Sequence, residues 1–309
     1  MQAIRDTGFV VAGNQGVGAA FLRKTDALGD EEWSRTYTET DQVLTARVVL
    51  ENPAGGFVVA GSRSAGAYLS QGLILFVDAS GAEQRRALVG PIAPFGLSEI
   101  TALLPVAGGG WIAGGTTGSS FLPGSSSPFV VRLAADGSTL WQVTPTPATS
   151  LTSLDALAPA AGGSFVAAGS ALELLAGVHT RFQLWKFDDQ GHEIWHRDGF
   201  AEGAITPAGG PVGVAATPTG FVLAGTGCAA EVPCATTAQD AVLEAVDADG
   251  AFVREARIGG TANDGAFCAA AIAGGGVALA GYTESYGAGG RDAYVVTTGP
   301  DLTTGPPPA

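Results

Sequence analysis

The chain has 309 residues and a formal net charge of −14, with 15 basic residues against 29 acidic ones. This balance disfavours nucleic acid and anionic lipid surfaces as partners, because both need basic patches on the protein. No apolar run approaches the roughly 18 residues of a transmembrane helix, so we expect no membrane span.

A short apolar strand that ends on glycine recurs along the chain. The copy at residues 55–61 reads GGFVVAG, and five others read FVVAG, WIAGG, FVAAG, FVLAG and VALAG. Their last glycines are at positions 13, 61, 115, 169, 225 and 281. A period of about 50 residues with several strand-like segments per unit is typical of propellers and other repeat arrays.

The repeat predicts one β-propeller domain over residues 1–300 and a proline-rich tail at 301–309. The expected units lie near residues 1–43, 44–96, 97–150, 151–210, 211–264 and 265–300.

Each complete unit contains four strand-like segments in the same order. In the second unit they are residues 44–50, 57–60, 73–77 and 82–87. Short turns rich in Asp and Gly join the third and fourth segments, as tight hairpins require. Four residues beyond each turn glycine stands a Trp or Arg that we expect to pack on the neighbouring unit: Trp33, Arg85, Trp141, Trp195 and Arg254.

The first segment of several units is dominated by small residues, as suits a strand close to a crowded axis. The sequence therefore predicts an all-β fold, a β-propeller of about six four-stranded antiparallel blades. We expect Phe57, Trp111, Phe165 and Phe221 to form the packed layer between blades.

The first and last blades are predicted to be incomplete. Residues 1–8 leave no room for the innermost strand of the first blade, and prolines 306–308 stand where the last outer strand should be. Residues 1–7 contain no apolar signal segment, and we expect a fragment or a late start. The seam between the first and last blades is then the weakest part of the ring.

Residues 259–296, GGTANDGAFCAAAIAGGGVALAGYTESYGAGGRDAYVV, resemble the bacterial beta-propeller repeat (SBBP) and the related delta-sixty repeats. The resemblance extends over the chain in six units and is strongest in the last. It implies a propeller at the bacterial cell envelope or outside the cell, and for most members of these families no defined activity.

The connections after the second strand of each unit are long and unlike one another, which is where binding is commonly found on a rigid scaffold. Their exposed-aromatic candidates for a ligand face are Tyr68, Phe121, His179 and Tyr286. The alternative for each is packing on its own blade.

Three cysteines are present. Cys228 and Cys234 share one loop and could close a local disulfide or stay reduced. Cys268 is expected to be a buried small residue of an inner strand. His192 and His196 are expected to form a surface pair, and we predict no metal site and no cofactor. The Asp-rich turn at residues 247–250 is interpreted as a hairpin and not as a calcium loop.

These patterns favour a non-catalytic propeller that binds or scaffolds an unknown protein or glycan partner as a monomer. The alternative is a secreted propeller enzyme acting on glycans, with its site at the axis on the long-loop face. Catalytic residues brought together from different blades would leave no local signature, so no catalytic residue is assigned.

Overall fold

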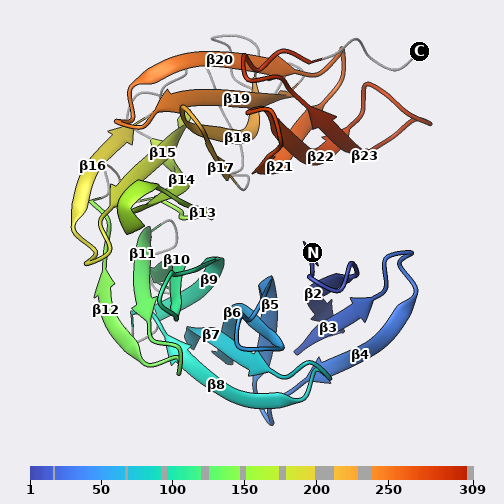
Figure 1. Cartoon of the computed structure of the whole chain (residues 1–309), viewed down its shortest axis with the longest axis vertical. Coiled ribbons are helices and arrows are strands. Elements are labelled where there is room, and N and C mark those ends of the chain that lie inside the picture. The colour runs from blue at the N-terminus through green and yellow to red at the C-terminus, as the bar shows by residue number, and fades with distance from the viewer. Residues whose placement is uncertain are drawn as a thin grey trace. The chain divides into compact units, whose positions relative to one another are not determined.

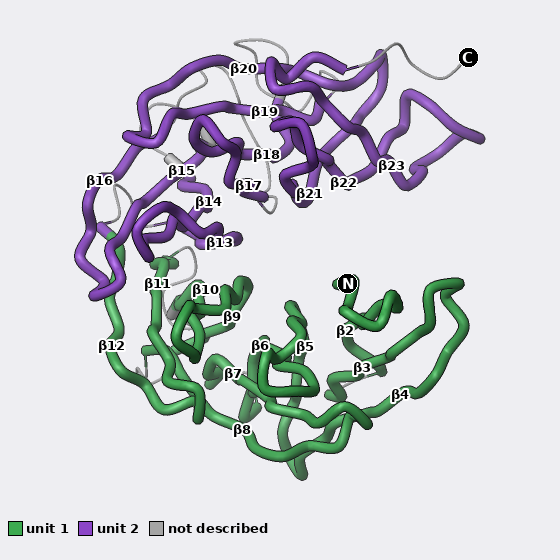
Figure 2. The backbone as a smooth tube through the Cα atoms, viewed as in Figure 1, with its two compact units in different colours: residues 1–145 green, residues 146–309 purple. Residues whose placement is uncertain are grey.

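The computed structural model describes residues 1–16, 18–66, 69–91, 96–119, 125–146, 151–173, 179–198, 212–228 and 239–304. Two compact units, Met1–Pro145 and Thr146–Ala309, make up the chain (Figure 2). Within the described ranges the structure is made of β-strands apart from one 3-10 turn, η1 (Ala161–Gly163) (Figure 1). The predicted all-β class is confirmed.

Unit 1 contains a four-stranded and an eight-stranded sheet. The first has the strands β1 (Gln2–Ala3), β2 (Phe9–Gln15), β3 (Ala19–Thr25) and β4 (Glu31–Tyr37). The second begins with β5 (Val43–Glu51), β6 (Phe57–Ala65), β7 (Leu69–Val77) and β8 (Glu83–Val89). It continues with β9 (Gly96–Pro105), β10 (Trp111–Ser119), β11 (Ser126–Leu133) and β12 (Thr139–Val143).

The eight-stranded sheet consists of two antiparallel meanders of four strands. They are joined by one parallel bridge between Ser70 of β7 and Leu97 of β9. The expectation that the first repeat lacks its inner strand was wrong, because β1 pairs with β2 through Gln2 and Ala3. This strand is only two residues long.

Unit 2 contains three antiparallel meanders. The first has the strands β13 (Ala156–Pro159), β14 (Phe165–Glu173), β15 (His179–Phe187) and β16 (Glu193–Asp198). The second has β17 (Gly213–Thr217), β18 (Gly220–Cys228), β19 (Gln239–Asp247) and β20 (Phe252–Ile258). The third has β21 (Asp264–Ala271), β22 (Val277–Thr283) and β23 (Asp292–Thr297). Among the described residues the last sheet has three strands. Prolines 306–308, where the outer strand was predicted to be missing, lie outside these residues, so that expectation stays a prediction.

The repeated closing glycine is required by a close approach between neighbouring strands. A Cβ atom on Gly61 would lie 2.1 Å from the carbonyl oxygen of Thr45, and one on Gly169 would lie 2.0 Å from that of Ser153. Any side chain here would push the first strand of the meander away. The same holds for Gly115 and Gly281, whereas at Gly13 and Gly225 a side chain would instead meet the rings of Phe21 and Phe182.

A β-bulge recurs at the start of the fourth strand in all five four-stranded meanders. In the fourth of them Phe187 pairs with Glu193 and Lys186 pairs with Trp195, so Ile194 is the extra residue. The same shift occurs in the other four. A bulge places two successive residues against one partner and increases the local twist.

The expected packing of aromatic residues between repeats is confirmed for Phe57, Trp111 and Phe221, whereas Phe165 contacts its own sheet. Phe57 packs against Trp33 of the first sheet, with ring centroids 5.9 Å apart. Trp111 belongs to a core cluster with residues of the preceding meander, and so does Phe221. Phe165 is also buried, and its ring stacks on Phe187 of its own sheet at 5.3 Å.

The long connections predicted after each second strand are shorter than expected. In the second repeat the connection was placed at residues 62–72, but β6 continues to Ala65 and β7 begins at Leu69. The hairpin keeps pairing through polar residues such as Arg63 and Gln71, because ladder hydrogen bonds do not depend on an apolar pattern.

No described helix is long and apolar enough to cross a membrane.

Candidate binding site on the C-terminal sheet

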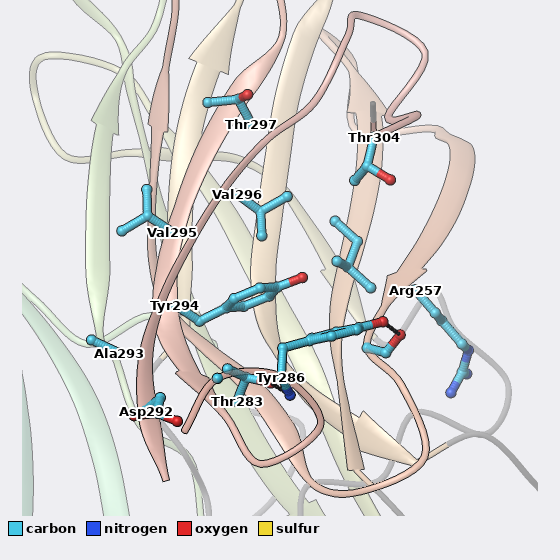
Figure 3. A pocket seen from close by; sticks show the side chains of 13 residues that line it. Arg257, Thr283, Tyr286, Asp292, Ala293, Tyr294, Val295, Val296, Thr297 and Thr304 are labelled. Carbon is cyan, nitrogen blue, oxygen red and sulfur yellow. Dashed lines mark hydrogen bonds between the residues drawn. The ribbon is translucent and has the colours of Figure 1, made fainter. Parts of the chain in front are cut away.

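A pocket of about 740 Å³ lies in unit 2 between the end of β20 and strand β23 (Figure 3). Its walls are Arg257 to Gly259, residues 292–297 of β23, and part of the connection that follows β22. Small-molecule and peptide pockets commonly fall in this range of volume. We call it the Tyr286 pocket.

The connection from β22 to β23 is held in place by a buried carboxylate. Asp264 has no exposed surface and accepts hydrogen bonds from the hydroxyls of Thr283 and Ser285 and from the amide of Gly260. Burial alone would raise the pKa of Asp264, but these hydrogen bonds outweigh it and hold the pKa below its usual value. Asp264 therefore stays ionised and fixes the connection.

Tyr286 is positioned directly by this network. Its amide donates to the Thr283 hydroxyl at 3.2 Å, and its own hydroxyl donates to the carbonyl oxygen of Gly259 at 3.1 Å. The ring stacks on that of Tyr294 from β23, with centroids 6.1 Å apart and planes at 17°. Figure 3 shows both rings directed into the pocket.

The Asp264 carboxylate acts on the Tyr294 ring. Burial first, then Tyr286 and the Asp264 carboxylate, raise the pKa of Tyr294. Behind the pocket, burial and the Asp264 charge also raise the pKa of Asp240. A Cβ atom on Gly259 would lie 2.0 Å from the Asp240 carboxylate, so glycine lets the backbone pass close to it.

Charged side chains at the pocket edge are already paired. Arg257 donates to Glu255 at 2.9 Å, and Asp292 accepts the amide of Ala288 at 3.0 Å. The pocket thus combines two stacked rings with carbonyl and hydroxyl groups in fixed positions. Such a surface can bind a flat or amphipathic group by stacking, cation–π attraction and hydrogen bonds.

Of the residues predicted for a ligand face, the structure places Tyr286 in this pocket. Tyr68, Phe121 and Cys234 lie outside the described residues. For His179 and Cys228 only the backbone positions, at the start of β15 and the end of β18, are described. The local disulfide therefore stays a prediction.

Sequence reasoning missed Tyr294 and Asp264. Both sit in strands, where they resembled ordinary members of the repeat. The available signal was the alternation in β23, since Tyr294 and Val296 share one face of the strand while Val295 points to the other. The partnership of Asp264 with Thr283 follows from strand register, which pairs these two residues directly.

The expectation for Cys268 was wrong, because its thiol is exposed. A bulge at Phe267 shifts the register between Ala266 and Cys268. Ala266 consequently faces the core, whereas Phe267 and Cys268 are exposed.

The predicted surface histidine pair was also wrong. His192 is exposed and contacts Asp188 at 2.9 Å. His196 is instead largely buried, stacked on Trp185 at 5.3 Å and bonded to Gln183 at 2.7 Å. His192 lies in the turn before β16, and the bulge at Ile194 separates it from His196.

The Asp-rich turn at residues 247–250 is a hairpin, as predicted. One carboxylate oxygen of Asp247 accepts the amides of Asp249 and Ala251. In the described part of the chain, no group of three or more His, Cys, Asp and Glu side chains is arranged to hold a metal ion.

No family model matches the sequence, and no curated protein matches it. Many solved structures are similar in fold, and three of them illustrate the similarity. A protein of unknown function from Bacteroides caccae has 10% identity and a TM-score of 0.54, covering 96% of this chain and 92% of that one. A protein of unknown function from Dyadobacter fermentans has 16% identity and a TM-score of 0.59, covering 84% and 80%.

The third is the C-terminal domain of Pseudomonas aeruginosa PilY1, with 14% identity and a TM-score of 0.50, covering 95% of this chain and 79% of that one. At these identities the similarity concerns the fold.

Proposed function

We propose that this protein is a non-catalytic β-propeller that binds or scaffolds a protein or glycan partner at the bacterial cell envelope or outside the cell. The regular repeat and the four-stranded meanders support a propeller of about six blades. The resemblance of residues 259–296 to envelope-associated propeller repeats supports the location.

The Tyr286 pocket is the observation that carries the binding role. Tyr286 is held by hydrogen bonds to Thr283 and Gly259, and its ring stacks on that of Tyr294, before any ligand arrives. A site that is already ordered loses little conformational entropy on binding. Tyrosine is enriched at protein interfaces because its ring is apolar and its hydroxyl is polar.

Isothermal titration calorimetry tests this role with chitotriose, maltotriose and a seven-residue peptide of alternating Arg and Val as probes. We expect one probe to bind, and Tyr286→Ala to weaken it at least tenfold. Ile194→Ala is the control. Ile194 is exposed and does not line the pocket, so this variant should leave the affinity unchanged.

Two results would contradict the proposal. The first is a probe that binds with the same affinity to Tyr286→Ala as to the unchanged protein. The second is release of reducing sugar from a trisaccharide by the purified protein. The second result would favour the alternative, an enzyme acting on glycans.

A further inference from the structure

A second bulge recurs in the first strand of three meanders, beside the residue that pairs with the repeated glycine. The inserted residue is Arg47 in β5, Thr101 in β9 and Phe267 in β21. Bulges are common next to active sites, where they redirect a side chain. In the last meander the redirected side chain is an aromatic ring, and 47% of Phe267 is exposed.

The last meander departs from the others beside this bulge. Two other meanders have a pair of bonded hydroxyl groups at this level: Thr45 with Ser62 at 2.8 Å, and Ser153 with Ser170 at 3.1 Å. Gly265 and Tyr282 take these places in the last meander and pair across β21 and β22. A Cβ atom on Gly265 would lie 2.6 Å from the Tyr282 ring, so glycine makes room for that ring. Departures from a regular pattern are expected at functional sites.

Tyr282 is buried and supports the exposed Phe267 ring. The two ring centroids are 5.5 Å apart, with planes at 35°. The Arg291 guanidinium lies 3.9 Å from the Tyr282 centroid, and the Tyr282 hydroxyl donates to the side-chain oxygen of Gln239 at 3.3 Å. Tyr282 therefore joins the exposed ring to two polar side chains.

The polar residues around Tyr282 are also linked to one another. The main-chain amide of Gln239 donates to the side-chain oxygen of Asn263 at 3.2 Å, and Asn263 donates to Glu284 at 3.0 Å. The Arg291 guanidinium donates to the other Glu284 oxygen at 3.2 Å. The side chains of Arg291 and Glu284 are 59% and 29% exposed, so both can also contact a ligand. We call Phe267, Tyr282, Glu284 and Arg291 the Phe267 platform.

We propose that the Phe267 platform binds one neutral pyranose ring of a glycan. The C–H face of the sugar would stack on the Phe267 ring, and its hydroxyl groups would bond to Arg291 and Glu284. Ligand sites commonly combine an aromatic surface with a few fixed polar groups. This inference rests on the proposed binding role and names a glycan as the partner. It adds a second site, since none of the four platform residues lines the Tyr286 pocket.

The charges of the platform favour a neutral sugar. Arg291 is already paired with Glu284, and the chain carries a net charge of −14. An acidic sugar would therefore meet a repulsion that the paired guanidinium does not offset. A protein partner commonly uses several aromatic or Arg anchors around a desolvated centre, whereas the platform offers one exposed ring beside charged residues. A single pyranose ring matches this arrangement.

Saturation-transfer difference NMR tests the inference with the full chain and the methyl β-glycosides of glucose, galactose and N-acetylglucosamine. Methyl β-D-glucuronide is the acidic counterpart. We expect at least one neutral glycoside to bind, and to bind more tightly than the glucuronide. Phe267→Ala should weaken its binding about tenfold or more, whereas Phe267→Tyr keeps the ring and should bind within about twofold of the unchanged protein.

Phe252→Ala is the matched control, because Phe252 is 49% exposed in the same unit and lies outside the platform. This variant should also bind within about twofold of the unchanged protein. The inference is wrong if no neutral glycoside binds, if the glucuronide binds more tightly, or if Phe267→Ala and Phe252→Ala bind equally well.

Three further results separate this inference from the proposed binding role. Binding of the Arg–Val peptide to the platform in place of a sugar would overturn the inference and leave the role standing. Loss of glycoside binding in Tyr286→Ala but not in Phe267→Ala would do the same. Glycoside binding that depends on Phe267, together with release of reducing sugar from a trisaccharide, would support the inference and overturn the non-catalytic role.

Discussion

The hydroxyl of Tyr37 at the end of β4 donates a hydrogen bond of 2.7 Å to the carbonyl oxygen of Gly81, in the turn between β7 and β8. It joins the fourth strand of one sheet to the hairpin of the next. Trp33 and Arg35 lie against the same glycine, since a Cβ atom on Gly81 would approach each within 2.7 Å. Adjacent meanders are therefore linked at their outer strands as well as through the apolar core.

Replacing Tyr37 by Phe should destabilise unit 1. The variant removes one buried hydrogen bond and leaves the Gly81 carbonyl without it, which typically costs roughly 1–3 kcal/mol. Urea unfolding followed by circular dichroism measures the loss. Tyr286→Phe removes a hydrogen bond from a more exposed hydroxyl and should cost less; equal losses would argue against a linking role for Tyr37.

Tyr37 should also make stability fall at alkaline pH. Burial raises the pKa of Tyr37 to about 12, compared with roughly 10 in an unfolded chain. The unfolded chain therefore releases the proton first, so the contribution is complete below about pH 10 and is lost as the pH rises towards 12. Unfolding of Tyr37→Phe between pH 8 and pH 11 should show a flatter profile than that of the unchanged protein.

Asp155, just before β13, predicts a pH dependence in the acidic range. Burial raises the pKa of Asp155 to about 6, although Ser153 and the Val212 amide donate to it. The folded state thus holds the proton between about pH 4 and pH 6 where the unfolded chain loses it, so stability falls as the pH rises through this window. A shift of this size is worth roughly 2–3 kcal/mol, and less here because Asp155 keeps some solvent contact.

Asp155→Asn keeps an acceptor for both donors and removes the charge. We expect the variant to be more stable than the unchanged protein at pH 7 and equal to it near pH 4. Thermal unfolding at the two pH values measures this difference. The assignment fails if the variant is less stable at pH 7.

Phe165→Ala should cost about 3–5 kcal/mol, the usual range for a buried aromatic residue. Phe165 is 2% exposed and stacks on Phe187, so its loss leaves a cavity in unit 2. Ile194→Ala, whose side chain is 53% exposed in the same unit, is the control and should change stability by less than about 0.5 kcal/mol. Equal effects of the two variants would mean that the strand faces are assigned wrongly.

Asp264→Asn should loosen the Tyr286 pocket. An Asn side chain cannot accept all the hydrogen bonds that Thr283, Ser285 and Gly260 now donate to two carboxylate oxygens. We expect faster amide exchange at Ser285 and Tyr286 and weaker binding of any ligand of the pocket. Unchanged exchange at both amides would show that the connection is held by other contacts.

The sequence was sufficient for those parts of the fold that repeat. Gly61 could be identified as the end of an apolar strand because its copies recur, and the Asp–Gly turns located the hairpins. The reason for Gly61 could not be seen, since the Thr45 carbonyl that excludes a side chain lies in another strand. Strand ends were also missed, because Arg63 and Gln71 pair without any apolar pattern.

Only part of the candidate site could be predicted from the sequence. Tyr286 was found because it is an aromatic residue in a connection, which is a local property. Tyr294 and Asp264 belong to the site only through strand register and the hydrogen bonds around Ser285. Contacts between strands of this kind are not encoded in any short stretch of sequence.

The bulge at the start of each fourth strand places a core residue directly beside an exposed, inserted residue. Trp195 must fit the core beside Gly250, whereas Ile194, the inserted residue next to it, contacts mainly solvent. Mutations at the inserted position can therefore accumulate without disturbing the register or the core. Across the five strands this position is Glu32, Gln84, Leu140, Ile194 and Val253. Glu32 is paired with Lys24 and Gln84 with Asp78, so the exposed residues Leu140, Ile194 and Val253 are the suitable places to attach a label or a linker.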